Sequence, residues 1–302
     1  MQLPVIRRAK WRLREFACLL AASALVAFAL ARPSIAQTQP AGAACPPADP
    51  EMTEFLEPLT EMMLVPGKSM NIPEMLRTMP PETMAKLAAL QKAAADRQAK
   101  DWPNLCRYAA ENAQIIASGI RPRVVFIGDS ITENWKPGDP SLFNATVLTR
   151  GIGGQTTPQI LLRFYQDVVA LRPRVVHIMA GTNDISGNTG PTSDQAIVNN
   201  IRAMIDIAKA NRIAVVLASI TPSKGFGMRP NFDPSFRIAA VNRQLAALAA
   251  ERRVTYVDYF PPLADGAGGF NAALANDGLH PNRAGYAAMR PLAERAVARA
   301  AK

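Results

Sequence analysis

The chain has 302 residues, of which 49% are hydrophobic, 19% charged and 6% aromatic, and its formal net charge at pH 7 is +10. That balance is typical of a globular protein and excludes a disordered, collagen-like or low-complexity chain. Beyond residue 36 the basic residues do not form a Lys/Arg cluster, so we expect no nucleic-acid partner.

Residues 1–36 have the organisation of an export signal. The basic stretch RRAKWRLR precedes an apolar run over 16–31, and Ser34 and Ala36 occupy the −3 and −1 positions of a cleavage site. The apolar run is shorter than the ~20 residues that span a bilayer. We therefore expect cleavage near Ala36 and a periplasmic or secreted mature chain that is not inserted in a membrane. An uncleaved membrane anchor is the alternative.

Residues 37–121 form a Pro-rich leader followed by a helical extension. Two prolines and a glutamate start a helical pattern at Pro81 that runs to about Lys100. A second pattern begins near Pro103, with apolar residues at helical spacing. We expect this extension to be separate from the domain that follows it.

Two cysteines, Cys45 and Cys106, remain once the signal segment is removed. An exported protein encounters conditions that permit disulfides, so we predict a Cys45–Cys106 bond, with two unpaired thiols as the alternative. The bond would close a loop of about 60 residues. Two cysteines without clustered histidines do not make a zinc site, and we expect no metal.

Residues 122–302 alternate short apolar runs with longer helical patterns. This alternation predicts a parallel β-sheet covered by helices, with its functional site at the carboxyl ends of the strands. We expect strands over 124–128, 146–150, 175–180, 214–219 and 254–257, and helices over 157–171, 194–210, 233–252 and 283–300.

The first expected strand leads into Gly128-Asp129-Ser130. A serine at a strand-to-helix turn exposes its hydroxyl and places its N–H at the positive end of a helix. Both features favour a nucleophile that faces a developing oxyanion. Because Asp and Ser are also preferred at helix starts, a simple helix cap is the alternative.

Polar and flexible residues also follow the next two strands. The turn GIGG at 151–154 lets the backbone approach a ligand closely, but it lacks the spacing of the nucleotide-binding motifs. Asn183 offers an amide donor and Asp184 an acceptor at the end of the third strand, with local turn bonding as the alternative.

The chain has only two histidines, His177 and His280. His177 lies inside an apolar strand, and we expect it to be packed with a satisfied nitrogen. In a serine hydrolase His280 would then be the general base. Asp277, three residues earlier, would orient the ring and stabilise its protonated form.

The four segments GDS, GIGG, GTND and DGLHP, in this order, resemble the SGNH (GDSL) hydrolase family. The resemblance covers residues 122–302, about 60% of the chain. It implies a flavodoxin-like, three-layer α/β/α fold with a doubly wound parallel sheet of about five strands. It also implies ester hydrolysis through an acyl-serine without metal or cofactor. One departure is Thr149, which stands where the family often has Asn.

The resemblance also assigns roles to five residues by motif. It implies that Ser130 is the nucleophile and donates its backbone N–H to the oxyanion. Gly154 would donate a second backbone N–H, and the Asn183 side chain a third. His280 would be the base and Asp277 its partner.

We expect an exported esterase that acts on a small ester or acylated glycan, with acetyl groups on carbohydrate or cell-envelope glycan as the favoured substrate. A lysophospholipase or thioesterase is the alternative enzyme, and a non-catalytic domain that binds acylated glycans is the alternative from another class. The loop 221–234 follows the fourth strand, and we expect Phe226, Arg229 and Phe232 to contact substrate there. A solvent loop without a role is the alternative.

Overall fold

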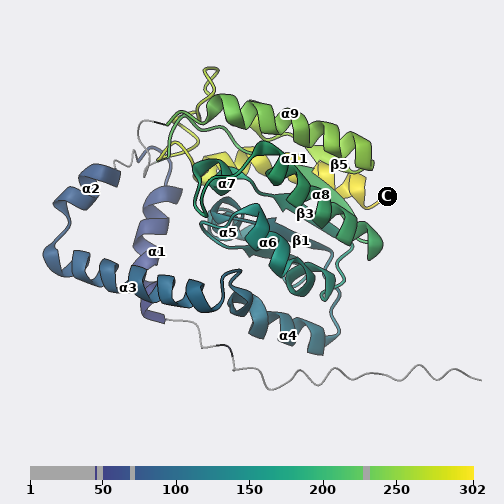
Figure 1. Cartoon of the computed structure of the whole chain (residues 1–302), viewed down its shortest axis with the longest axis horizontal. Helices are drawn as coiled ribbons and strands as arrows, with labels where there is room; N and C mark the ends of the chain where they lie inside the picture. Colours follow the sequence, from purple (N-terminus) through teal and green to yellow (C-terminus); the bar gives the residue numbers. More distant parts are fainter. Residues whose placement is uncertain (1–44, 46–49, 69–71, 227–231) are drawn as a thin grey trace, which may run out of the picture. The chain divides into compact units, whose positions relative to one another are not determined.

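The computed structural model describes residues 45, 50–68, 72–226 and 232–302. At its centre is a five-stranded parallel sheet in the order β2-β1-β3-β4-β5 (Figure 1). Because β1 lies between β2 and β3, the chain winds outward in both directions, which confirms the expected doubly wound topology. The strands are β1 (Val124–Gly128), β2 (Val147–Gly151), β3 (Val175–Met179), β4 (Ala214–Ala218) and β5 (Thr255–Val257).

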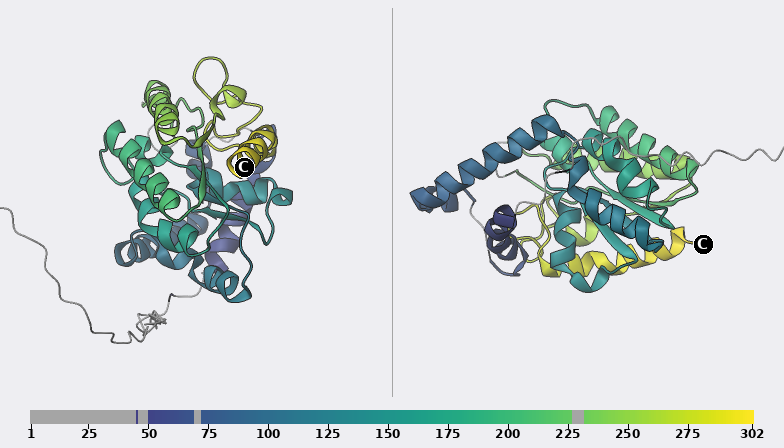
Figure 2. Two further views of the ribbon diagram at one scale, coloured as in Figure 1. Left: turned by 90° about the vertical axis from the view of Figure 1, so that its right-hand side faces the viewer. Right: turned by 90° about the horizontal axis from the view of Figure 1, so that it is seen from below.

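Helices cover both faces of the sheet, so that two helical layers and the sheet between them make three layers (Figure 2). Successive strand residues alternate between two hydrophobic clusters, as the pleat requires: Val125 faces one cluster and Phe126 the other. The first cluster includes residues of α6 (Thr157–Phe164), α8 (Asp194–Ala210) and α9 (Ser235–Arg252). The second includes residues of α5 (Ser130–Gly138), α10 (Phe260–Leu263) and α11 (Arg283–Ala300).

Several of these helices begin with a side-chain cap, which fixes where the chain turns from loop into helix. Asp129 accepts a hydrogen bond from the Ile131 N–H, and Thr156 and Gln159 form a capping box at the start of α6. Asn282 accepts two backbone N–H groups at the start of α11. The ranges expected for two helices, 194–210 and 283–300, are those of α8 and α11 in the structure.

The structure over 157–171 differs from the single α-helix expected there. It consists of α6 and a π-helical turn, η3 (Tyr165–Val169), in which the Ala170 N–H bonds to the Tyr165 carbonyl. Within this turn the buried carboxylate of Asp167 pairs with Arg163 Nη1 at 2.9 Å. Helical periodicity alone does not distinguish such a turn from a continuous α-helix.

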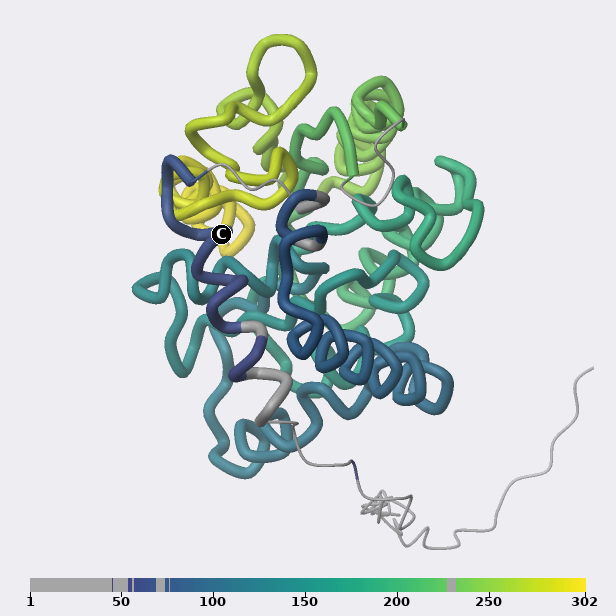
Figure 3. The backbone as a smooth tube through the Cα atoms, turned by 90° about the vertical axis from the view of Figure 1, so that its left-hand side faces the viewer, coloured from purple at the N-terminus to yellow at the C-terminus, as the bar shows by residue number. Residues whose placement is uncertain are grey.

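The described part of the N-terminal extension contains five helical segments: α1 (Pro50–Leu64), α2 (Ile72–Thr78), α3 (Pro81–Lys100), the 3₁₀ turn η1 (Leu105–Tyr108) and α4 (Ala109–Ser118) (Figures 1 and 3). The end of α1 is bonded to the loop before α11. Asn276 Nδ2 donates to the carbonyls of Met62, Met63 and Val65, at 3.0, 3.0 and 2.6 Å. Leu64 is buried in the second hydrophobic cluster. The expected boundary at residue 121 stays a prediction.

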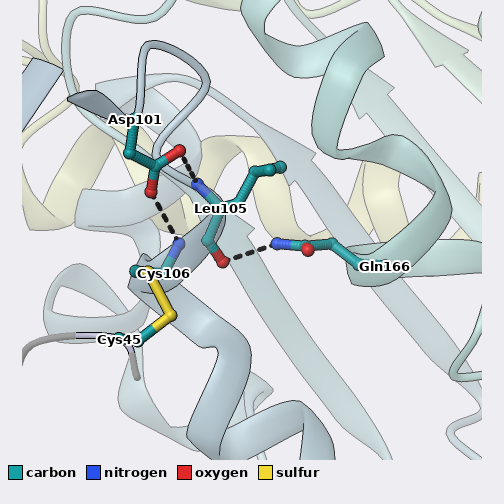
Figure 4. The surroundings of a disulfide bond; sticks show 5 residues. All are labelled: Cys45, Asp101, Leu105, Cys106 and Gln166. Carbon is teal, nitrogen blue, oxygen red and sulfur yellow. Dashed lines mark hydrogen bonds between the residues drawn. A yellow bond between two sulfur atoms is a disulfide. The ribbon is translucent and has the colours of Figure 1, made fainter. Parts of the chain in front are cut away.

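The predicted disulfide between Cys45 and Cys106 is present. Figure 4 shows a second set of bonds around it: Asp101 accepts the N–H groups of Leu105 and Cys106, at 2.8 and 2.9 Å. The Leu105 carbonyl accepts from Gln166 Nε2 at 2.6 Å. The disulfide therefore ties the chain before α1 to a turn that hydrogen bonds also hold.

The expected signal segment 1–36, with its cleavage site at Ala36, lies outside the described residues. Among the helices that the structure does describe, none combines the length and apolar character needed to cross a membrane.

Reduction of the disulfide is expected to lower the melting temperature while the fold is retained. Opening a loop of this length costs up to ~4 kcal/mol on the chain-entropy model, whereas Asp101 and Gln166 still hold η1. Thermal unfolding with and without reductant measures the effect, and alkylation of unreduced protein followed by mass spectrometry counts its free thiols. Two free thiols per chain would refute the bond.

Candidate active site

Ser130 is the first residue of α5 and follows a tight turn at the end of β1. A side chain at Gly128 would lie 2.2 Å from Thr132 Oγ1 and 2.3 Å from the Met179 carbonyl, so only glycine fits there. Asp129 is extended and caps the helix. The N–H of Ser130 belongs to the first turn of α5, where backbone donors have no partner within the helix.

Ser130, His280 and Asp277 form a continuous hydrogen-bonded chain. Ser130 Oγ lies 2.9 Å from His280 Nε2, and His280 Nδ1 lies 2.6 Å from Asp277 Oδ2. Asp277 Oδ1 accepts the backbone N–H groups of Leu279 and His280, at 2.9 and 2.8 Å. The carboxylate thus fixes both the ring and its backbone, and the ring presents Nε2 to the serine.

The charges around His280 favour its protonated form. Burial lowers the pKa of His280, but the hydrogen bond and charge of Asp277, together with the charge of Asp129, outweigh burial and raise that pKa above 6.5. For Asp277, burial raises the pKa, and the bond to His280 outweighs this and lowers it. Burial raises the pKa of Asp129 to about 6.

His177 lies in the core, as the sequence indicates. Its Nε2 is 2.9 Å from the Tyr259 hydroxyl, and its ring packs among Phe126, Trp135 and Tyr259. Burial lowers the pKa of His177 to about 3, so the ring is neutral at physiological pH. Of the two histidines, only His280 contacts Ser130.

The glycine turn after β2 leaves one backbone donor free. The N–H of Ile152 bonds to the Gly128 carbonyl at 3.1 Å, that of Gly153 to Glu133 Oε2 at 2.7 Å, and that of Gln155 to the Ile152 carbonyl at 3.3 Å. Within the described parts of the chain, no acceptor meets the Gly154 N–H. Gly154 has a φ of +76°, a conformation that favours glycine.

Asn183, in α7 (Thr182–Ser186), has a fixed amide orientation. Its Nδ2 donates to the Gln155 carbonyl at 3.0 Å, while its Oδ1 accepts from Asn188 Nδ2 at 2.9 Å. The same Asn188 nitrogen donates to the Gly154 carbonyl at 3.1 Å. One hydrogen of the Asn183 amide remains available. The sequence does not reveal Asn188, because nothing in its spacing links it to the glycine turn.

One hydrogen bond and one short distance bring these groups to one place. The Asn183 bond joins the end of β3 to the glycine turn. A side chain added at Gly153 would lie 3.7 Å from Ser130 Cβ, so the turn lies directly beside the serine. A hydroxyl with an adjacent proton acceptor, next to free N–H donors, is the arrangement that acyl transfer requires.

Two polar residues near the site have structural contacts. Asp184 accepts the backbone N–H and the hydroxyl of Thr157, at 2.8 and 2.6 Å, and thereby holds the start of α6. Thr149, where the family often has Asn, donates to the Thr132 carbonyl at 3.0 Å and connects β2 to α5. Threonine therefore supplies a bond between these elements here.

The loop expected to contact substrate is partly described. Phe226 is 4% exposed and belongs to the first hydrophobic cluster. Its ring stacks on that of Phe232, with centroids 6.1 Å apart. Arg229 lies outside the described residues. A substrate contact of these three residues stays a prediction.

Comparison with known proteins finds similar sequences and folds. The GDSL-like lipase/acylhydrolase family matches residues 126–288. A crystal structure of a Bacteroides fragilis protein assigned to the acylhydrolases is 39% identical, covers 67% of this chain and 99% of its own, and has a TM-score of 0.64. A GDSL-like lipase from Bacteroides thetaiotaomicron is 37% identical, covers 66% of this chain and 100% of its own, and has a TM-score of 0.63.

A curated relative is the uncharacterised lipoprotein YqeF of Bacillus subtilis, which is 34% identical over 82 residues. The match covers 26% of this chain. The chain spans about a third of that relative's length, 34%.

The two histidines are expected to titrate differently in an NMR experiment on the ring protons. His280 should show a pKa above 6.5, because Asp277 stabilises its charged form, and His177 should stay neutral down to about pH 4. Replacement of Asp277 by Asn is the control and should lower the pKa of His280. A wild-type His280 pKa below 6.5 would show that burial, not Asp277, dominates.

Proposed function

The chain belongs to the GDSL-like lipase/acylhydrolase family and is an ester hydrolase, and from this premise we propose that it removes short acyl groups from carbohydrate or cell-envelope glycan. The reaction proceeds through an acyl-serine at Ser130. The observation that carries the proposal is the hydrogen-bonded chain from Ser130 Oγ through His280 to Asp277.

In the first half of the reaction, Ser130 Oγ attacks the ester carbonyl and its proton passes to His280 Nε2. The carbonyl oxygen becomes an oxyanion, which accepts hydrogen bonds from the N–H groups of Ser130 and Gly154 and from Asn183 Nδ2. Each such donor stabilises the transition state by ~3–4 kcal/mol. Asp277 stabilises the imidazolium, and His280 then protonates the departing alcohol.

In the second half, water attacks the acyl-serine. His280 accepts a proton from the water, the oxyanion forms again among the same donors, and collapse releases the acid as His280 returns its proton to Ser130 Oγ. The side chains end in their starting state. The chain's own residues carry each proton transfer, and the low pKa of Asp277 keeps its carboxylate charged throughout.

Two observations support the location. The export signal over 1–36 and the lipoprotein relative support a periplasmic or secreted enzyme. In this proposal residues 37–121 are the extension and 122–302 the hydrolase domain.

Substitutions at the reacting residues test the mechanism with p-nitrophenyl acetate as substrate. Ser130→Ala and His280→Ala are each expected to lower kcat on the order of 10⁴-fold or more, because each removes a partner of the same proton transfer. His177→Gln is the matched control, since that ring has no contact with Ser130, and it should lower stability instead. Loss of turnover in folded His177→Gln with activity kept in His280→Ala would reverse the assignment.

The wild-type rate should also depend on pH through a single group. His280 accepts a proton only when neutral, so kcat/KM should rise as the pH increases through its raised pKa and then level off. A profile that rises through a pKa near that of Asp129, about 6, and that does not shift in Asp277→Asn would show that His280 is not the general base.

A series of p-nitrophenyl esters from acetate to palmitate tests the acyl length. We expect the highest kcat/KM with acetate, and a changed length preference in Phe232→Ala, which leaves the buried Phe226 in place. A preference for palmitate would favour the lysophospholipase alternative. The absence of turnover on every ester, with binding to acetylated glycan, would favour the binding domain. An unchanged profile in Phe232→Ala would remove that residue from the substrate site.

A further inference from the structure

The extension contacts the glycine turn that holds Gly154. The Tyr108 hydroxyl donates to the Gly151 carbonyl at 2.5 Å, and Tyr108 is 6% exposed. Gln155 Nε2 donates to the Pro103 carbonyl at 2.8 Å. Both ends of the turn over 151–155 are therefore bonded to residues that precede the expected hydrolase domain.

Two guanidinium groups lie close to the Tyr108 ring. The guanidinium carbons of Arg107 and Arg150 lie 4.9 and 4.7 Å from its centroid. Arg150 is fully buried, and its Nε donates to Asn112 Oδ1 at 2.9 Å. Burial raises the pKa of the Tyr108 phenol well above its ordinary value, so the hydroxyl stays protonated and donates to Gly151.

A second anchor acts two residues along the turn. The Gly153 N–H donates to Glu133 Oε2 at 2.7 Å, and Glu133 Oε1 accepts from Arg107 Nη2 at 3.2 Å. Tyr108 and Arg107 are neighbours in η1. The same short element thus holds Gly151 directly and Gly153 through Glu133.

A turn with three glycines has more backbone freedom than other segments, so contacts outside the turn are needed to fix its conformation. An oxyanion donor is effective when it is oriented before the reaction begins. The orientation of the Gly154 N–H follows from the positions of the residues before it, because Gly151 and Gly153 are both bonded to partners outside the turn.

We propose that Tyr108 is a positioning residue for the oxyanion donor Gly154, so that the segment over 101–112 is part of the catalytic unit. The proposal rests on the proposed function, in which Gly154 binds the oxyanion. The Bacteroides fragilis structure covers 67% of this chain, more than the roughly 60% that residues 122–302 make up, so part of the shared fold precedes residue 122.

Tyr108→Phe tests the proposal, because it removes only the hydroxyl and keeps the ring that the two guanidinium groups contact. We expect kcat for p-nitrophenyl acetate to fall on the order of tenfold, with KM within about twofold and the pKa of the pH profile unchanged. Tyr165→Phe is the matched control, since Tyr165 is 67% exposed, and it should have wild-type kinetics.

A second readout does not depend on turnover. Amide hydrogen exchange across 151–155 should be faster in Tyr108→Phe than in the wild type and the Tyr165→Phe control. Glu133→Gln weakens the second anchor, and its loss of kcat should combine non-additively with that of Tyr108→Phe, because both act on one turn. If Tyr108→Phe does not fold, Glu133→Gln alone should raise exchange over 151–155 and lower kcat.

The outcomes separate the two proposals. A lower melting temperature with unchanged kcat and unchanged exchange at 151–155 would give Tyr108 a purely structural role and overturn the inference. If the wild type turns over, Ser130→Ala is inactive and Tyr108→Phe is fully active, this inference is contradicted and the proposed function is not. Absence of wild-type turnover with faster exchange in Tyr108→Phe would contradict the proposed function while the positioning of the turn stands.

Discussion

The buried guanidinium of Arg163 is the interaction on which the site depends. Its Nη2 donates to the Gly128 carbonyl at 2.8 Å and its Nη1 to the Arg150 carbonyl at 2.8 Å, so one side chain joins the ends of β1 and β2. Its Nε donates to Gln155 Oε1 at 2.6 Å. Asp167 Oδ2 lies 2.9 Å from Arg163 Nη1, and the carboxylate balances the charge of the guanidinium. Loss of one partner of a buried pair typically costs ~3–5 kcal/mol, so this cluster has little freedom to rearrange.

With those strand ends fixed, the reacting groups need only short local turns to meet. Ser130 follows β1 by two residues, the glycine turn follows β2, and Asn183 follows β3 by four. His280 approaches from the loop before α11, held by Asp277. The parallel sheet brings these segments to one edge. There the hydrogen-bonded chain of Ser130, His280 and Asp277 lies beside the glycine turn.

The sequence predicts the elements well because the strands are buried on both faces and the capped helices α8 and α11 have clear ends. It also identifies the four motifs, since three lie at the end of a strand and the fourth directly precedes α11. It does not reveal Tyr108, Glu133 or Asn188, because their partners in the glycine turn are distant in sequence or belong to another element. A backbone carbonyl or N–H leaves no signature in residue type. The π turn is missed for a related reason. Its backbone hydrogen bond spans five residues where that of an α-helix spans four, and residue type does not show this difference.

If Ser130 forms the covalent intermediate, an alkyl fluorophosphonate should react with its hydroxyl, and peptide mass spectrometry identifies the labelled residue. We expect one adduct per chain, on the peptide that contains Ser130, formed slowly in His280→Ala and not at all in Ser130→Ala. An adduct on another residue of the folded wild type, or unchanged labelling of the Ser130→Ala protein, would contradict this role of Ser130.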